Sequence, residues 1–419
     1  MSTDNAASAL RMRATWYSFL LTGFYIYIVN VQGNVVPFLQ AEFALSYRAV
    51  SLHSSAIALG TILVGLAGDR VVAAIGRRRT LWLGVAGLGG GGILLCLAPA
   101  PLAGQLPWAS IGACFLIGAL GALVPALVPA ILADLHGDRR AAAYAGQAIT
   151  AYSFGLAAPL VSGFAIWAGL GWRAAVIFGA LVGIGIALWF RKLPIADAPH
   201  AEVQPHAKSS SHLPPAFWAY WLLQFTTCGV ELSLLFWAPA FLERVVGFTP
   251  AGAALAAAGF PLGVLLGRIA LRLVVRRLPP RRLLLPALGV VVLGFALYWG
   301  LGSLGENGAG LAQPAAILGV FLLGLGVAPL YPLSTEFAIG AVPASRPGAR
   351  DLAAMRMALS IGLSLLLAPI ALGGLADEIG LGRAHLVLPG LVVAAAASFL
   401  AGEALLRRAG QPDAGSQIG

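Results

Sequence analysis

The chain has 419 residues, of which 59% are hydrophobic and only 10% are charged, and its mean hydropathy is +0.88. Soluble domains carry about 25% charged residues, so this composition excludes a water-soluble protein and predicts an integral membrane protein. The formal net charge of +10 does not indicate a nucleic-acid partner. The basic residues fall in short loops beside apolar runs, where they set membrane topology.

Apolar segments follow one another along the whole chain. Because a membrane-spanning helix needs about 20 apolar residues, we predict an all-α membrane protein whose spans lie at residues 15–38, 50–68, 80–98, 108–133, 142–167, 173–190, 216–241, 250–274, 283–302, 314–339, 352–374 and 385–406. Cys96, Cys114 and Cys228 lie inside these segments, where they are expected to act as packing residues rather than as metal ligands or disulfide partners. Residues 1–13 lack the apolar core of a cleavable signal peptide.

The distribution of Lys and Arg predicts the orientation of these twelve spans. Of the 26 basic residues, the loops after odd-numbered spans hold only Arg48, Arg173, Arg244 and Arg383, and Arg268 lies inside a span. The others lie in the termini, the loops after even-numbered spans and the linker, with Arg272 and Arg356 at the span ends that border those loops. Since basic loops stay in the cytoplasm, we expect both termini to be cytoplasmic, in a membrane of the bacterial inner type.

A charged stretch separates the second and third spans. It runs from Gly65 through Asp69-Arg70 to Gly76-Arg77-Arg78-Arg79, and we expect it to form a tight cytoplasmic loop. These residues resemble the loop signature of the major facilitator superfamily of secondary transporters, G-x-x-x-D-R-x-G-R-R-x. About four extra residues, roughly one helical turn, separate Arg70 from Gly76, and we interpret them as a longer helix end.

The two halves of the chain resemble each other. Ala158-Pro159-x-x-x-Gly163, with Arg173 ten residues beyond the glycine, recurs as Ala368-Pro369-x-x-x-Gly373 with Arg383. Two parallel six-helix repeats with a substrate site at their interface are what the family resemblance implies. We therefore predict two pseudo-symmetric six-helix bundles, at 1–190 and 216–419, joined by a cytoplasmic linker at 191–215. The three histidines of that linker are expected to be solvated, with no metal bound.

Glu231 is the residue most strongly indicated for a functional role, because it lies near the middle of the seventh predicted span. An ionised side chain at mid-bilayer costs about 2.5–3.5 kcal/mol on insertion scales, and such residues mark substrate or proton pathways. We expect Glu231 to carry protons during transport; a structural pairing with a serine or arginine is the alternative. His53, near the outer end of the second span, is a second candidate for proton transfer, or else a capping or gating contact.

Polar residues within the spans are candidates for substrate binding. Tyr27, Asn30 and Asn34 share one face of the first span by helical spacing, whereas Gln32 points elsewhere. They suit hydrogen bonding to a polar solute, and hydrogen bonding between helices is the equal alternative. The residues expected to complete an aromatic-lined cavity are Tyr152, Gln224, Trp237 and Tyr331.

The family resemblance also implies a cytoplasmic gate. It would include the motif residues Gly65, Asp69, Arg70, Gly76, Arg77 and Arg78, with Asp69 meeting the start of the eleventh helix near Arg350 and Arg356. Arg77 or Arg78 is expected to bridge to Asp134, and Arg276 or Arg277 to Glu336. Such links would close the cytoplasmic side in one transport state and break in the other. Arg268 replaces the acid expected in the second-half copy of the motif.

The sequence departs from the family pattern at two positions. Proton-coupled members often carry an arginine in the fourth span, about four residues before Gly-x-x-Gly, and Cys114 occupies that position here. Drug antiporters often carry G-x-x-x-G-P-x-x-G-G in the fifth span, of which Pro159 and Gly163 remain.

The sequence thus predicts an alternating-access secondary transporter and not an enzyme, since no nucleotide-binding or hydrolase motif is present. One deep acid with few deep bases favours proton-coupled transport of a neutral or cationic organic solute, with export slightly preferred. The alternative is proton-coupled uptake of an organic acid or sugar, which becomes preferable if Arg268 or Arg356 lines the midplane. A lipid flippase or a non-transporting receptor is the alternative of another class. We expect a monomer, whose partners are substrate, protons and lipid, without a cofactor.

Overall fold

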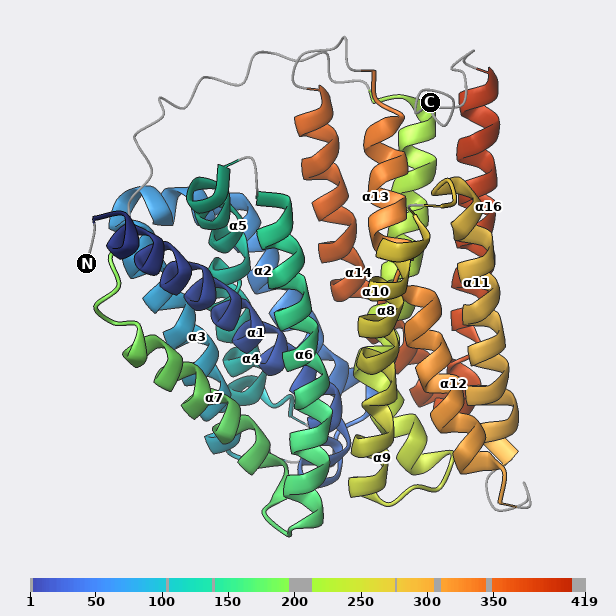
Figure 1. Cartoon of the computed structure of the whole chain (residues 1–419). Helices are drawn as coiled ribbons and strands as arrows, with labels where there is room; N and C mark the ends of the chain where they lie inside the picture. Colours follow the sequence, from blue (N-terminus) through green and yellow to red (C-terminus); the bar gives the residue numbers. More distant parts are fainter. Residues whose placement is uncertain are drawn as a thin grey trace. The chain divides into compact units, whose positions relative to one another are not determined.

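The computed structural model describes residues 3–102, 105–137, 140–195, 213–275, 277–304, 310–343 and 349–408. Within these residues the chain is helical and contains no β-strand (Figure 1). The elements are α1 (Thr3–Phe43), α2 (Tyr47–Ile75), α3 (Arg77–Leu97), α4 (Trp108–Gly121), α5 (Leu123–His136), α6 (Arg140–Trp167), α7 (Gly171–Trp189), α8 (Pro215–Arg244), α9 (Pro250–Ala257), α10 (Gly259–Val274), α11 (Arg281–Phe295), the π-helix η2 (Ala296–Leu301), α12 (Ala312–Val327), α13 (Leu330–Gly340), α14 (Ala349–Ile379), α15 (Leu381–Ala384) and α16 (Val387–Arg408).

These elements form 12 helical segments that are long and apolar enough to cross a membrane, which confirms the predicted number of spans. Most of them extend a few residues beyond the predicted apolar cores. The second span, for instance, covers Tyr47–Ile75 where the apolar pattern predicted 50–68. The extensions of this span include the charged residues Arg48, Asp69 and Arg70, at which a search for apolar residues stops. Five spans are built from two elements each: α4 with α5, α9 with α10, α11 with η2, α12 with α13, and α15 with α16.

Prolines account for the interruptions between paired α-helices. A proline ring clashes with the carbonyl group four residues earlier and removes one backbone hydrogen bond. Helix α4 ends at Gly121, four residues before Pro125, and α9 ends at Ala257, four residues before Pro261. Likewise, Pro332 lies four residues after Ala328, the first residue beyond the end of α12. Other prolines, such as Pro159 in α6 and Pro369 in α14, lie inside continuous helices.

By their contacts, the residues form two compact units. Unit 1 comprises Met1–Pro199 with Phe248–Ala258, and unit 2 comprises His200–Gly247 with Gly259–Gly419. The first unit therefore includes α9, which packs against α6. Of the predicted linker 191–215, residues 196–212 lie outside the part of the chain that the structure describes.

The packing inside one unit is repeated inside the other. In unit 1, α1 packs on α6, α7 and α5, and α4 packs between α2 and α3. In unit 2, α8 packs in the same way on α14, α16 and α13, and α12 packs between α10 and α11. The central helices of the two units, α1 and α8, carry most of the polar residues predicted to bind substrate.

Glycine allows the closest of these helix contacts at matching places in the two units. A Cβ atom added at Gly118 of α4 would lie 2.1 Å from the Ile57 carbonyl oxygen of α2. A Cβ atom at Gly324 of α12 would likewise lie 2.1 Å from the Phe260 carbonyl oxygen of α10. Small residues let backbones approach in membranes, where no hydrophobic force drives helices together. These positions agree with the repeat inferred from sequence.

The charged stretch between the second and third spans is helical, and the prediction of a tight loop over its whole length was wrong. Helix α2 continues through Asp69 and Arg70 to Ile75, and α3 begins at Arg77. Only Gly76 is outside a helix, with φ of 80°, a backbone conformation that favours glycine. The extra residues of the motif therefore lengthen α2 by about one turn, which confirms the longer helix end.

Candidate functional site

A cluster of ionisable side chains within the spans lies in unit 2 and consists of Glu231 on α8, Arg268 on α10, and Tyr331 on α13, with Cys228 beside them. We call it the Glu231 cluster. The guanidinium carbon of Arg268 lies 6.0 Å from the centre of the Tyr331 ring. The charge of Arg268 acts directly on the Glu231 carboxyl group, and both charges act on Tyr331. Glu231, Arg268 and Tyr331 are half-buried within the chain.

This arrangement changes the electrostatics expected at the middle of the seventh span. The sequence suggested an acid with few deep bases near it, whereas in the structure the charge of Arg268 acts on the Glu231 carboxyl group. Opposite charges in a low-dielectric medium compensate each other, and each would be far more costly alone. With Glu231 ionised the pair is neutral, and with Glu231 protonated the site carries the positive charge of Arg268.

Gln224, one of the predicted substrate-binding residues, connects three helices of unit 2. Its side chain is fully buried. The amide nitrogen donates to the Met357 carbonyl oxygen at 3.1 Å and to Ser360 Oγ at 3.0 Å, both on α14. The amide oxygen accepts from Ser334 at 3.2 Å and from Thr335 at 2.7 Å, both on α13. All four hydrogen bonds of this amide thus join α8 to its neighbours.

Trp237 has a similar role farther along α8. Its indole N–H donates to the Pro369 carbonyl oxygen of α14 at 3.0 Å, and its side chain is fully buried. Ser364 of α14 donates in the opposite direction, to the Phe225 carbonyl oxygen at 2.7 Å. Gln224 and Trp237 therefore hold α8 against α14, and their predicted contact with substrate stays a prediction.

In unit 1 the predicted polar face of α1 lies between two other helices. The Tyr27 hydroxyl donates to the Ala175 carbonyl oxygen of α7 at 2.9 Å, and the side chain is buried. Asn30 is half-buried and packs closely on α6. A Cβ atom added at Gly155 of that helix would lie only 2.8 Å from Asn30 Nδ2. Asn34 is buried, and its Oδ1 atom has no hydrogen-bond partner among the described residues. Tyr152 is half-buried on α6.

A neutral contact occupies the position where proton-coupled relatives often carry an arginine. The Cys114 thiol of α4 donates to Gln32 Oε1 of α1 at 3.8 Å, and both side chains are buried. Gln32 therefore faces α4 rather than the α6 and α7 side of its helix. The fourth span contributes no charge at this depth.

His53 is buried between α2 and α4. Its Nδ1 atom lies 2.8 Å from the Val50 carbonyl oxygen, and its Nε2 atom lies 2.8 Å from Ser110 Oγ. Ser110 also donates to the Pro107 carbonyl oxygen at 3.0 Å. Both ring nitrogens thus have partners, and the contact of Nε2 with Ser110 joins α2 to α4.

Several of the predicted gate residues meet at one end of unit 1. Arg77 Nη1 lies 2.5 Å from Asp134 Oδ2 at the end of α5, so that the suggested ion pair is formed by Arg77. The Arg78 guanidinium donates to the Arg191 carbonyl oxygen, just after α7. Gly65, Asp69 and Arg70 are exposed on the last turns of α2.

The corresponding residues of unit 2 are only partly described. Arg276 lies outside the described residues, as does the side chain of Arg350. Glu336 and Arg356 are exposed on α13 and α14, and the Arg356 carbonyl oxygen accepts a hydrogen bond from Trp221 at 2.7 Å. The expected contact between Asp69 and the start of α14 stays a prediction.

Two further polar contacts were not anticipated from sequence. In unit 2, Tyr220 donates to Glu403 at 2.6 Å, and Glu403 pairs with Arg281 at 3.2 Å, so that α8, α16 and α11 are linked. In unit 1, Glu42 at the end of α1 pairs with Arg173 of α7. The arginine ten residues after Gly163 was visible as part of the repeat, but its pairing with Glu42 was not.

The chain matches the protein-family model described as Major Facilitator Superfamily over residues 18–365. No curated protein matches it. Among solved structures, it is similar to the nucleoside transporter NupG, with a TM-score of 0.68, 15% identity, and coverage of 95% of this chain and 99% of that chain.

Two other structures show a similar fold. A bacterial homologue of the human lysosomal transporter Spinster, inward-facing and unoccupied, gives a TM-score of 0.68 at 19% identity, covering 95% of this chain and 98% of that one. A D-xylose–proton symporter gives 0.70 at 16% identity, covering 94% and 97%. At these identities the likeness concerns the fold, and the family match covers most of the chain. The protein is therefore a member of the major facilitator superfamily, a transporter with 12 membrane-spanning helical segments and not an enzyme.

Proposed function

We propose that the protein is a proton-coupled symporter for a small organic anion, working by alternating access. The proposal is carried by Arg268, which lies within the spans of unit 2, 6.0 Å from the centre of the Tyr331 ring, and whose charge acts on Glu231. The sequence-based preference for a neutral or cationic solute depended on an acid with few bases near it. With Arg268 adjacent, the anionic alternative is favoured.

The charge balance of the pair explains how proton and substrate would move together. When Glu231 is ionised, it neutralises Arg268, and an anion gains little by entering. When Glu231 is protonated, it no longer balances the guanidinium charge, which then attracts a carboxylate and can bind it through two parallel hydrogen bonds. The Tyr331 ring beside Arg268 provides an aromatic wall for the substrate. Proton and anion bind together, and the loaded site carries no more net charge than the empty one.

Transport in proteoliposomes with an imposed pH gradient tests this function. For one proton per monovalent anion, each pH unit is worth about 1.4 kcal/mol, or about tenfold accumulation. We expect a labelled monocarboxylate to accumulate toward the alkaline side and its accumulation to be unchanged by a potassium diffusion potential. Proton-driven exchange of an organic cation would instead establish the antiport alternative. Accumulation that ignores the pH gradient would remove proton coupling altogether.

We also propose that the basic end of unit 1 faces the cytoplasm of a bacterial-type cell. Arg13, Arg70 and Arg77 lie toward that end, where α1 begins and α2 ends, whereas Arg48 and Arg173 lie where α1 ends and α7 begins. The positive-inside rule then orients the unit with its N-terminus inside. Labelling of single cysteines introduced at Arg48 and Arg70 with a membrane-impermeant reagent on whole cells should modify only the former. Labelling at position 70 alone would reverse the orientation.

The ion pair between Arg77 and Asp134 is proposed as part of the cytoplasmic gate. It joins the start of α3 to the end of α5 at the basic end of unit 1, and Asp69 and Arg70 are exposed on the neighbouring turns of α2. Interfaces of this kind have two discrete arrangements, so that breaking a small number of polar contacts can accompany opening. The monomer is proposed as the working unit, since one chain contains both repeats.

A further inference from the structure

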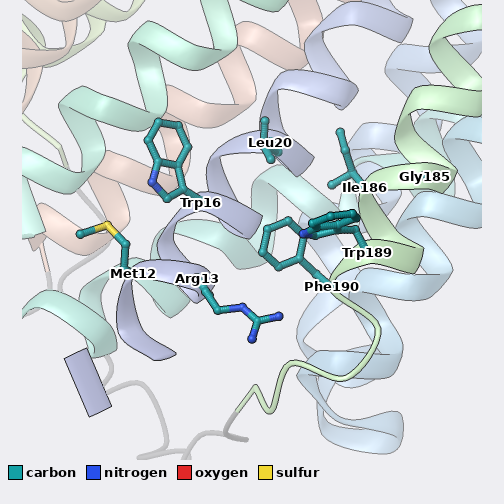
Figure 2. A pocket seen from close by; sticks show the side chains of 8 residues that line it. All are labelled: Met12, Arg13, Trp16, Leu20, Gly185, Ile186, Trp189 and Phe190. Atoms are coloured by element: carbon teal, nitrogen blue, oxygen red, sulfur yellow. The ribbon is translucent and has the colours of Figure 1, made fainter. Parts of the chain in front are cut away.

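A cavity of about 490 Å³ opens on unit 1 between the first turns of α1 and the last turns of α7. Its walls are apolar except for Arg13, and the apolar side chains that form them are Met12, Trp16, Leu20, Ile186, Trp189 and Phe190. Figure 2 shows these side chains arranged around the space between the two helices, with Arg13 extending from α1 toward the α7 side. The volume lies within the range of about 300–1,000 Å³ typical of ligand pockets.

The aromatic residues place this cavity at the surface of the bilayer. Trp16 is 50% exposed and Trp189 is 79% exposed. Tryptophan is enriched where the hydrocarbon meets the headgroups, because its ring is apolar and its N–H is polar. Below this level the wall continues with Leu20 and Ile186, which suit an acyl chain. The cavity thus combines an interfacial opening with an apolar interior.

The charge at the opening is positive. Arg13 is exposed and forms no ion pair with any residue that the structure describes. Arg191 and Lys192 follow α7 directly and are also exposed. Asp134, a described acid at this end of the unit, is paired with Arg77. Basic pockets between helices at the cytoplasmic surface are suited to anionic lipid headgroups.

We propose that this cavity binds an anionic phospholipid, with its phosphate on Arg13 and an acyl chain over Leu20 and Ile186. Helix α1 carries Asn30 and Asn34 farther along, so the lipid would stabilise one end of a helix that carries predicted substrate-binding residues. The proposal needs only the membrane setting shown by the family and does not depend on the nature of the transported substrate.

Native mass spectrometry of the full-length protein, purified in detergent, provides the test. The probes are phosphatidylglycerol and phosphatidylcholine added at equal concentrations. We expect the wild type to retain phosphatidylglycerol in preference to phosphatidylcholine by about tenfold, as one charge-assisted contact of about 1.4 kcal/mol would give. Arg13→Gln should abolish the preference, and Arg13→Lys should restore part of it. Arg408→Gln removes a comparable exposed charge from α16, which lines no part of the cavity, and should change nothing.

A second variant tests the apolar part without removing charge. Gly185 lines the cavity, and a Cβ atom added there meets nothing within 4 Å, so Gly185→Leu is chosen to add apolar volume at this wall. It should reduce phosphatidylglycerol binding about as strongly as Arg13→Gln, while the apparent Tm measured without lipid stays unchanged. Equal binding of both lipids by the wild type, or undiminished phosphatidylglycerol binding in both variants, would overturn the proposal.

Discussion

The guanidinium group of Arg77, at the start of α3, lies 2.5 Å from the carboxylate of Asp134, near the end of α5. The Arg77 side chain is only 10% exposed, whereas that of Asp134 is 57% exposed. A contact between a buried base and a solvated acid is screened by water, and its strength is that of an exposed pair, about 0.2–1 kcal/mol. Such an energy can shift a conformational equilibrium without fixing it, as a gate requires.

Breaking this pair should shift the protein toward the state that is open at the basic end. We expect Arg77→Gln and Asp134→Asn each to raise the labelling rate of a cysteine introduced at that end by a few fold, and the double variant to add nothing further. The exchange Arg77→Asp with Asp134→Arg should restore the original rate. Additive effects of the two single variants would show that the pair is not coupled.

The close contact of α4 with α2 gives a prediction about stability. A side chain at Gly118 would have to displace the α2 backbone, because its Cβ atom would lie 2.1 Å from the Ile57 carbonyl oxygen. We expect Gly118→Ala to destabilise the protein by about 1–3 kcal/mol, as overpacking does. The apparent Tm in detergent measures it. Gly112 lies on the same helix with nothing within 4 Å, so Gly112→Ala is the matched control and should leave the Tm unchanged.

Gln224 should prove structural when it is removed. Gln224→Leu removes the side-chain hydrogen bonds that join α8 to Ser360 of α14 and Thr335 of α13, which keep only their bonds to backbone carbonyls of their own helices. The loss of such partners costs about 1–3 kcal/mol, so the apparent Tm should fall. Gln313→Leu, which removes an exposed glutamine, is the comparison. A variant with unchanged Tm and greatly weakened substrate binding would instead support the original expectation that Gln224 contacts substrate.

The sequence was sufficient for the architecture because the bilayer restricts the possibilities. Apolar length predicted the spans, and the repeat of the 158–163 pattern at 368–373 predicted the two halves. What sequence could not predict was which helix lies beside each polar residue. Tyr27 and Asn30 do lie on one side of α1, but that side is shared by α7 and α6, and these side chains contact those helices. Helical periodicity predicts which side of its own helix a residue lies on, but it does not predict which other helix packs against that side.

The interaction of Arg268 with Glu231 could not be predicted from sequence either, because it depends on which helices pack together. Arg268 was conspicuous as a charge inside a span, yet only the packing of unit 2 brings its charge to act on Glu231. Prolines offered a signal that was not used. Each of Gly121, Ala257 and Ala328 lies four residues before a proline, at or just after the end of a helix. This spacing is expected because the proline ring clashes with the carbonyl group four residues earlier.

Removal of Arg268 should damage stability and transport in separable ways. Arg268→Leu leaves an acid without its compensating charge, so its apparent Tm should be lower than that of the double variant Arg268→Leu with Glu231→Gln. Both variants should lose anion transport, because neither has the guanidinium group. If the double variant were the less stable of the two, the electrostatic coupling of these residues would not contribute to the fold.

The central claim is that Glu231 carries the proton, and the substitution Glu231→Gln tests it most directly. Glutamine keeps the shape of the protonated acid, so Arg268 stays available for the anion at every pH. In proteoliposomes the variant should exchange labelled for unlabelled anion at a rate close to that of the wild type, yet fail to accumulate the anion when a pH gradient is imposed. Glu243→Gln, which changes the acid at the end of the same helix, should accumulate it normally. Accumulation by Glu231→Gln at the wild-type level of about tenfold per pH unit would contradict the mechanism.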